Sequence, residues 1–117
     1  MSRHDVGVSL RQMLDHAREA RERVRGRTRS DLDSDRTLDL SLVRLLEILG
    51  EAASRVPPGK RTQYPRIPWA GVVGLRNRLI HGYDKVDFDV VWKIASEELD
   101  PLIAELERIV PDLEPPP

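Results

Sequence analysis

The chain has 117 residues, enough for one hydrophobic core and too few for two. It contains no cysteine, which excludes a disulfide framework, a thiol nucleophile and a cysteine-based zinc site. The net charge of -1 lacks the basic excess of a general nucleic-acid-binding domain. No long apolar run predicts a signal peptide or a membrane span, so we expect a cytoplasmic protein without a membrane partner.

The charges are distributed unevenly along the chain. Residues 1–30 hold eight arginines and four acidic residues, whereas residues 84–117 hold ten acidic residues and three lysines or arginines. The N-terminal part and the central helix could therefore face an anion, and the acidic C-terminal segment could not.

The first predicted helix covers about residues 4–25. Its apolar residues recur at three- and four-residue steps from Val6 to Val24, the spacing of one helical face. Gly26 is expected to end this helix. The polar connection over residues 27–34 has room for one short turn.

The second predicted helix covers about residues 35–56. It is apolar on more than one side, which indicates packing against more than one neighbour. Gly50 lies in its interior, where glycine costs about 1 kcal/mol relative to alanine. We therefore expect another helix to approach closely at this point. Pro57 and Pro58 end the helix.

A basic loop over residues 59–67 precedes a third predicted helix, which begins at Pro68 and ends near Gly82. Asp87 is expected to cap a fourth helix. Pro101 predicts a kink or break in this last helix at residues 99–101.

No segment alternates as a strand does, so the sequence predicts an all-α protein, an antiparallel bundle of four to five helices. We expect one domain over residues 1–112 and a proline-rich tail over residues 113–117.

The stretch Leu75–Tyr83 reads LRNRLIHGY and is the candidate site. The imidazole of His81 can both take and give a proton near neutral pH. Arg76 offers a fixed positive fork for a phosphate, although a continuous helix would place it about 140° from His81. Asn77 could hold the imidazole or a substrate oxygen. The chemistry that fits is attack of an RNA 2′-hydroxyl on the adjacent phosphate without a metal or cofactor.

A purely structural interpretation of the same residues stays open on spacing alone. Arg76 and Arg78 could be solvated helix charges, and His81 could interact with the negative end of the helix dipole.

The stretch resembles the Arg-x4–6-His signature of HEPN domains, and its extension to His-x-Tyr resembles the HepT subfamily. HepT is the toxin half of the HepT/MntA toxin–antitoxin systems. Residues 45–53 are similar to the family's second helix, and Pro68-Trp69 and residues 90–92 also fit. The resemblance covers about residues 5–110.

This resemblance implies a helical bundle that forms a homodimer, with the two signature helices lining a composite cleft for RNA. It implies a ribonuclease in which Arg76 and His81 are catalytic, and we assign Asn77 and Arg78 to substrate binding. It also implies an MntA-like nucleotidyltransferase antitoxin that AMPylates Tyr83. Bulk and negative charge beside the cleft would repel an RNA backbone.

Other notable residues are interpreted as structural. We expect Trp69 and Trp92 in the core or an interface rather than as base-stacking platforms. His4 and His16 are expected at the surface. Arg44 and Glu51 could pair with or orient the signature from the second helix.

Two other functions compete with the ribonuclease prediction. The chain could be a non-catalytic helical partner that binds a nucleotidyltransferase or a nucleotide, since a basic cleft can bind phosphate without cleaving it. It could also be a structural dimerisation module.

Overall fold

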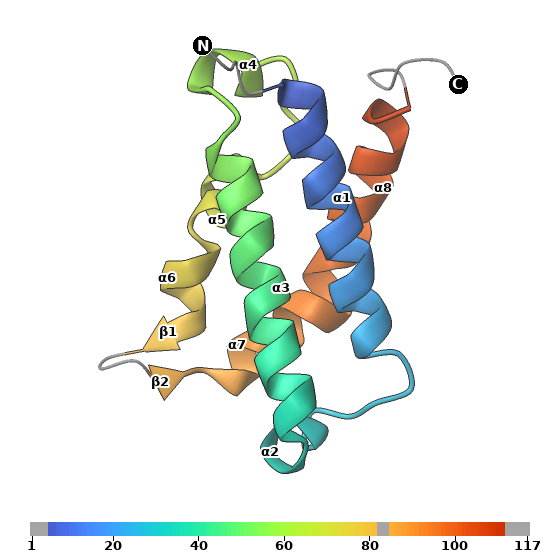
Figure 1. Ribbon diagram of the computed structural model, residues 1–117, viewed down its shortest axis with the longest axis vertical. Coiled ribbons are helices and arrows are strands. Elements are labelled where there is room, and N and C mark those ends of the chain that lie inside the picture. Colours follow the sequence, from blue (N-terminus) through green and yellow to red (C-terminus); the bar gives the residue numbers. More distant parts are fainter. Residues whose placement is uncertain (1–4, 82–84, 112–117) are drawn as a thin grey trace.

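The computed structural model describes residues 5–81 and 85–111. Its centre is a pair of antiparallel helices, α1 (Val6–Arg23) and α3 (Arg36–Ser54). Figure 1 shows α8 (Leu99–Ile109) beside α1, and two short helices flanking α3 on the other side. The expected helical fold is confirmed for the described residues, apart from one pair of two-residue strands.

Helix α1 begins and ends through local capping. The Asp5 carboxylate accepts a hydrogen bond from the Gly7 N–H at 2.8 Å and so caps the start of the helix. Gly26 has a φ of +71°, the left-handed conformation that favours glycine after a helix. The short turn expected in the connection is helix α2 (Asp31–Ser34).

Helix α3 is the central element because it is buried on more than one side. The Asp35 carboxylate caps it by accepting from the Leu38 N–H at 3.0 Å. The close approach expected at Gly50 is confirmed, since a Cβ there would lie 3.1 Å from the Val72 carbonyl oxygen. Its buried apolar residues are Leu38, Leu42, Leu45, Leu46, Leu49, Ala52 and Ala53.

The prediction of one continuous third helix was wrong. The chain forms helix α5 (Trp69–Val73) and helix α6 (Leu75–Leu79), separated at Gly74. A Cβ at residue 74 would lie only 3.0 Å from the Ala70 carbonyl oxygen, so glycine permits this tight junction. Beyond α6, strand β1 (Ile80–His81) pairs antiparallel with strand β2 (Lys85–Val86).

The hairpin replaces the last turn of the expected helix. The Asp87 N–H donates to the Leu79 carbonyl at 2.8 Å, which ties the start of the next element to the end of α6. Ile80 has φ −107° and ψ 124°, an extended conformation that suits a β-branched residue. Two residues per strand are too few to show alternation in the sequence.

The basic loop before α5 also contains one short helix, α4 (Pro58–Arg61).

The last helical region has three parts: α7 (Phe88–Lys93), a π-helical segment η1 (Ile94–Glu98), and α8. The predicted cap is confirmed, because the Asp87 carboxylate accepts from two N–H groups of the first turn of α7. The irregularity lies N-terminal to the expected residues 99–101. Proline has no N–H to donate to the carbonyl four residues earlier, and the wider π-helical turn lies directly before α8. Pro101 itself lies in the first turn of α8, where proline is tolerated.

The structure gives two further observations on organisation. No helix within the described ranges is long and apolar enough to cross a membrane. The tail predicted over residues 113–117 lies outside the described part of the chain, so its boundary stays a prediction.

Candidate active site

Arg76 lies on an exposed side of α6, in a shallow groove between α3 and the α5–α6 segment. Among the residues that the structure describes, no carboxylate forms an ion pair with its guanidinium. An unpaired guanidinium keeps its donors available for a phosphate oxygen. The groove is lined by Glu47, Gly50, Glu51, Ser54, Val73 and Arg76.

Two carboxylates share this groove with Arg76. Glu51 forms an ion pair with Arg44 on the same helix at 3.6 Å, and both side chains are exposed. Arg44 and Glu51, expected to pair with or to orient the signature, instead pair with each other, and Glu51 also lines the groove. Arg44 offsets part of the negative charge that Glu51 and Glu47 place opposite Arg76.

The backbone of His81 lies in β1, directly opposite Lys85. Because α6 ends at Leu79, the chain changes from helix to strand between Arg76 and His81. The angle of about 140° expected for a continuous helix therefore does not apply to this pair. Tyr83, predicted as the AMPylation site, lies outside the described residues, and its role stays a prediction.

The two substrate-binding candidates differ in their surroundings. Asn77 is exposed on α6. Arg78 is held by Glu98 of η1: its Nη1 and Nη2 donate to the two carboxylate oxygens at 3.0 and 2.9 Å. The sequence offered no signal for this contact, because Glu98 lies 20 residues further along the chain.

Both partners of this ion pair are partly buried, with side chains 37% and 36% exposed. The hydrogen bonds from Arg78 lower the pKa of the Glu98 carboxyl against the opposing effect of burial. The same bonds raise the pKa of Arg78. Both groups therefore stay charged near neutral pH.

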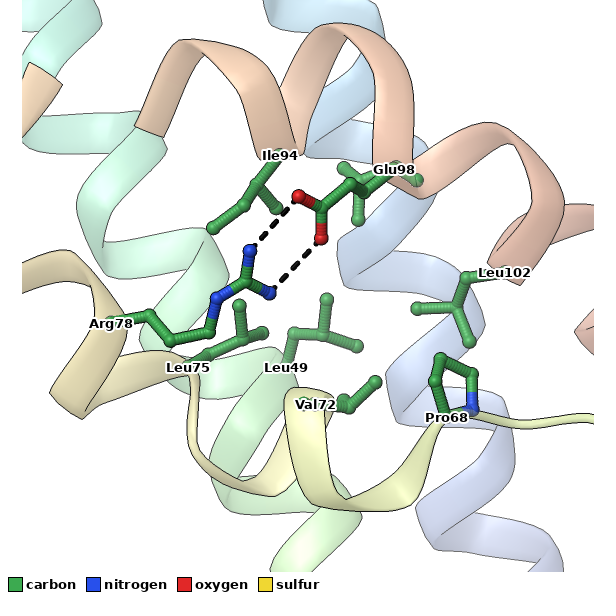
Figure 2. Close-up of a pocket in the computed structure, with 10 residues that line it drawn as sticks. Leu49, Pro68, Val72, Leu75, Arg78, Ile94, Glu98 and Leu102 are labelled. Atoms are coloured by element: carbon green, nitrogen blue, oxygen red, sulfur yellow. Dashed lines mark hydrogen bonds and ion pairs between the residues drawn. The ribbon is translucent and has the colours of Figure 1, made fainter. Parts of the chain in front are cut away.

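The ion pair lies at the edge of an apolar cavity of about 100 Å³. Figure 2 shows the guanidinium and the carboxylate meeting beside aliphatic side chains from α3, α5, α6 and the η1–α8 region. The cavity is distinct from the Arg76 groove, since the two share no lining residue. Its lining consists of Leu49, Pro68, Gly71, Val72, Leu75, Arg78, Ile94, Glu98, Leu99 and Leu102.

The comparison with protein families decides what kind of chain carries this site. The family model described as "Ribonuclease HepT-like" matches residues 13–109, which include both signature residues, Arg76 and His81. The chain belongs to the HepT-like ribonuclease family.

The relatives of this HepT-like chain carry ribonuclease names. A protein of Methanocaldococcus jannaschii named "Putative RNase MJ1380" is 33% identical over 93% of this chain and 100% of its own length. A second protein of that organism, "Putative RNase MJ1216", is 30% identical over 97% of this chain and 94% of its own. "Probable ribonuclease HepT" of Thermococcus cleftensis is 34% identical over 68% of this chain and 72% of its own. No solved structure matches the chain.

The tryptophans of this HepT-like chain pack against the core, one of the two places expected for them. The Trp69 Nε1–H donates to the carbonyls of Arg61 and Tyr64 at 3.1 and 3.0 Å, which fastens the preceding loop to α5. Trp92 is half-buried against the core.

His16 is half-buried, with Nδ1 2.7 Å from the Gln12 carbonyl oxygen of its own helix, and His4 lies outside the described residues.

Proposed function

We propose that this chain is a HEPN endoribonuclease, the toxin of a toxin–antitoxin system, which cleaves RNA without a metal ion. Membership of the HepT-like ribonuclease family supports ribonuclease activity. The observation that carries the assignment of Arg76 is its guanidinium, which has no carboxylate partner in the described part of the chain and lies in a groove. A homodimer would bring the Arg76 and His81 residues of two copies into one cleft.

The proposed reaction is an intramolecular transesterification. The His81 imidazole of one copy takes the proton of a ribose 2′-hydroxyl, whose oxygen attacks the adjacent phosphorus. The bond from phosphorus to the 5′-oxygen breaks, and the partner's imidazolium gives that oxygen a proton. Arg76 stabilises the negative charge that builds on the phosphate oxygens, and Asn77 holds a substrate oxygen. The products are a 2′,3′-cyclic phosphate and a 5′-hydroxyl.

The second part of the proposal concerns control of the site. An MntA-like nucleotidyltransferase would transfer AMP from ATP to the Tyr83 hydroxyl, two residues after His81, with release of pyrophosphate and of the hydroxyl proton. The added phosphodiester carries negative charge and the nucleotide adds bulk, and both oppose the approach of an RNA backbone. The unmodified protein is therefore the active form.

The test is cleavage of RNA by the purified, unmodified protein in the presence of a metal chelator. We expect the parent to cleave and His81→Ala to lose about 10²–10⁴-fold in rate, the usual contribution of general acid–base catalysis. Arg76→Ala should also lose most activity, whereas Arg23→Ala is the matched control because Arg23 pairs with Glu19 on α1. Circular dichroism must show equal helicity for all four proteins.

Cleavage by His81→Ala at the parent's rate would show that the assignment of catalysis to this motif is wrong. No cleavage by any of the proteins, with Tyr83 shown by mass spectrometry to be unmodified, would favour the non-catalytic partner of a nucleotidyltransferase.

A further inference from the structure

Helix α6, which carries Arg76, has few attachments of its own. It consists of the five residues Leu75–Leu79, and no side chain caps its N-terminus. A helix of this length does not persist by its own hydrogen bonds, so its position depends on tertiary contacts. Leu75 and Leu79 are its two buried residues.

Apolar packing leaves room beneath this helix. The cavity of about 100 Å³ lies between α6 and its neighbours and is lined in part by Leu75 and Val72. Atoms that line a cavity have protein neighbours on fewer sides than atoms of a filled core, so protein packing constrains α6 less on this side. Besides its two buried leucines and the Asp87–Leu79 backbone hydrogen bond, a side-chain contact holds α6.

The Arg78–Glu98 ion pair supplies this contact. Two parallel N–H···O bonds between planar groups fix orientation as well as distance. Glu98 is the last residue of η1, and π-helical segments occur frequently at functional sites. The tether therefore joins α6 to the irregular turn of the neighbouring helix (Figure 2).

Arg78 and Arg76 lie on different faces of the same short helix. Two residues correspond to about 200° of rotation, so one side chain meets η1 while the other lines the groove beside α3. Any rotation of α6 allowed by loss of the tether would move Arg76 in the groove. A misplacement of about 1 Å can cost about 10²-fold in rate.

We propose that Arg78 and Glu98 form a positioning pair that sets the orientation of α6 and thereby of Arg76. This inference rests on the proposed ribonuclease function. The Arg78 guanidinium is occupied by Glu98, so it acts through the helix and not by binding RNA. Glu98 becomes a residue of the site without touching the substrate.

The sign of the Glu98→Gln effect separates positioning from electrostatics. The substitution keeps the size of the side chain and removes one negative charge near the proposed RNA site around Arg76. If charge alone mattered, RNA would bind more tightly and KM would fall. Positioning predicts instead that kcat falls about tenfold or more, with KM changed less than threefold, at a temperature where the variant is fully folded.

The experiment measures kcat, KM and Tm for the parent, Glu98→Gln, Arg78→Gln and their double variant. We expect the double variant to lose no more in kcat than either single variant, because all three lack the same tether. The exchanged pair Arg78→Glu with Glu98→Arg should recover part of the lost kcat. Glu107→Gln is the matched control, since it breaks another interhelical ion pair, Arg18–Glu107, away from α6.

Two results would overturn the positioning pair while leaving the ribonuclease in place. One is cleavage by Glu98→Gln at the parent's kcat. The other is an Arg78→Gln effect confined to KM and absent from Glu98→Gln, which would mean that Arg78 binds RNA directly.

Hydrogen exchange tests the pair without any RNA. We expect the α6 amides to exchange at least tenfold faster in Glu98→Gln than in the parent or in Glu107→Gln. Unchanged protection of the α6 amides in Glu98→Gln would overturn the positioning pair, whether or not the parent cleaves RNA. Absence of cleavage by the parent would count only against the ribonuclease function.

Discussion

At Gly50, the unfavourable helix propensity of glycine predicts close packing before the packing partner is known. A glycine inside a helix of good helix formers indicates close packing, and the structure places the Val72 carbonyl oxygen of α5 there. The identity of that neighbour was not predictable, because it depends on the break at Gly74. The same limit applies to Arg78, whose partner Glu98 lies in a different element.

We predict that Gly50→Ala destabilises the protein. The new Cβ would lie 3.1 Å from the Val72 oxygen and 3.4 Å from the Leu75 Cβ, so α5 and α6 must shift. Because the atom at 3.1 Å belongs to the backbone, which shifts less easily than the end of a side chain, we expect the overpacking cost of about 1–3 kcal/mol to exceed the gain of about 1 kcal/mol in helix propensity. Thermal unfolding should show a lower Tm.

The matched control for this substitution is Gly59→Ala. Gly59 lies in α4, and a Cβ there would have nothing within 4 Å. This variant should leave Tm unchanged or raise it slightly. A Gly50→Ala protein as stable as the parent would show that α5 does not pack against α3 at the distance described.

At the scale of elements, the long helices were predictable and the short ones were not. The periodicities gave α1 and α3 to within a few residues, because each buries a continuous stripe. The third predicted helix failed, since α5 and α6 each satisfy helical spacing and only tertiary packing reveals the break between them. Pro101 correctly indicated an irregular helix, but the irregularity lies before it, in η1.

The tether between α6 and η1 predicts a dependence of stability on pH. Arg78 lowers the folded-state pKa of Glu98 below its ordinary value of about 4.5. The stabilisation is therefore complete above that ordinary value and is lost as pH falls through the lower, folded-state pKa. Arg78 stays charged throughout this range. Solvent screening keeps the effect small, since both side chains are about a third exposed.

Urea unfolding at pH 6 and at a series of values below 4.5 measures this contribution. The parent should be more stable than Glu98→Gln at pH 6, and the difference in free energy of unfolding should shrink as pH falls. Glu97→Gln controls for removal of one carboxylate from the same segment. A difference that stays constant with pH would mean that the ion pair contributes nothing to stability.

At the scale of the whole molecule, ion pairs within the fold join charges from the two unevenly charged parts of the chain. Arginines of the N-terminal part pair with acidic residues of the C-terminal part: Arg18 with Glu107, Arg21 with Asp100, and Arg29 with Asp89. These three arginines, from the part predicted to face an anion, therefore have partners in the protein. Composition alone could not reveal these pairs, because the first two depend on α1 lying beside α8 (Figure 1) and the third on contact between the loop after α1 and α7.

Residues 52–83 differ from the rest, because they contain no aspartate or glutamate. This segment includes Arg55 and Lys60, both exposed, and leads along α5 and α6 to Arg76. We expect it to contribute to the binding of RNA phosphates. The doubly substituted variant with Arg55→Gln and Lys60→Gln should bind RNA more weakly, with kcat little changed.

The salt dependence of binding gives the quantitative form of this prediction. Each lost phosphate contact should reduce the slope of log K against log salt concentration by roughly 0.7 for a single strand. Arg23→Gln with Arg25→Gln removes the same charge from ion-paired residues of α1 and its C-terminal turn and serves as the control. An equal loss of slope in both variants would assign the effect to net charge instead of to this segment.

The most direct measurement is the chemical identity of the ends that the unmodified parent leaves on RNA in the presence of a chelator. Catalysis by Arg76 and His81 through the 2′-hydroxyl predicts 2′,3′-cyclic phosphate and 5′-hydroxyl ends, and no cleavage of a fully 2′-O-methylated copy of the same RNA. Products with 3′-hydroxyl and 5′-phosphate ends, or equal cleavage of the methylated RNA, would contradict the proposed reaction.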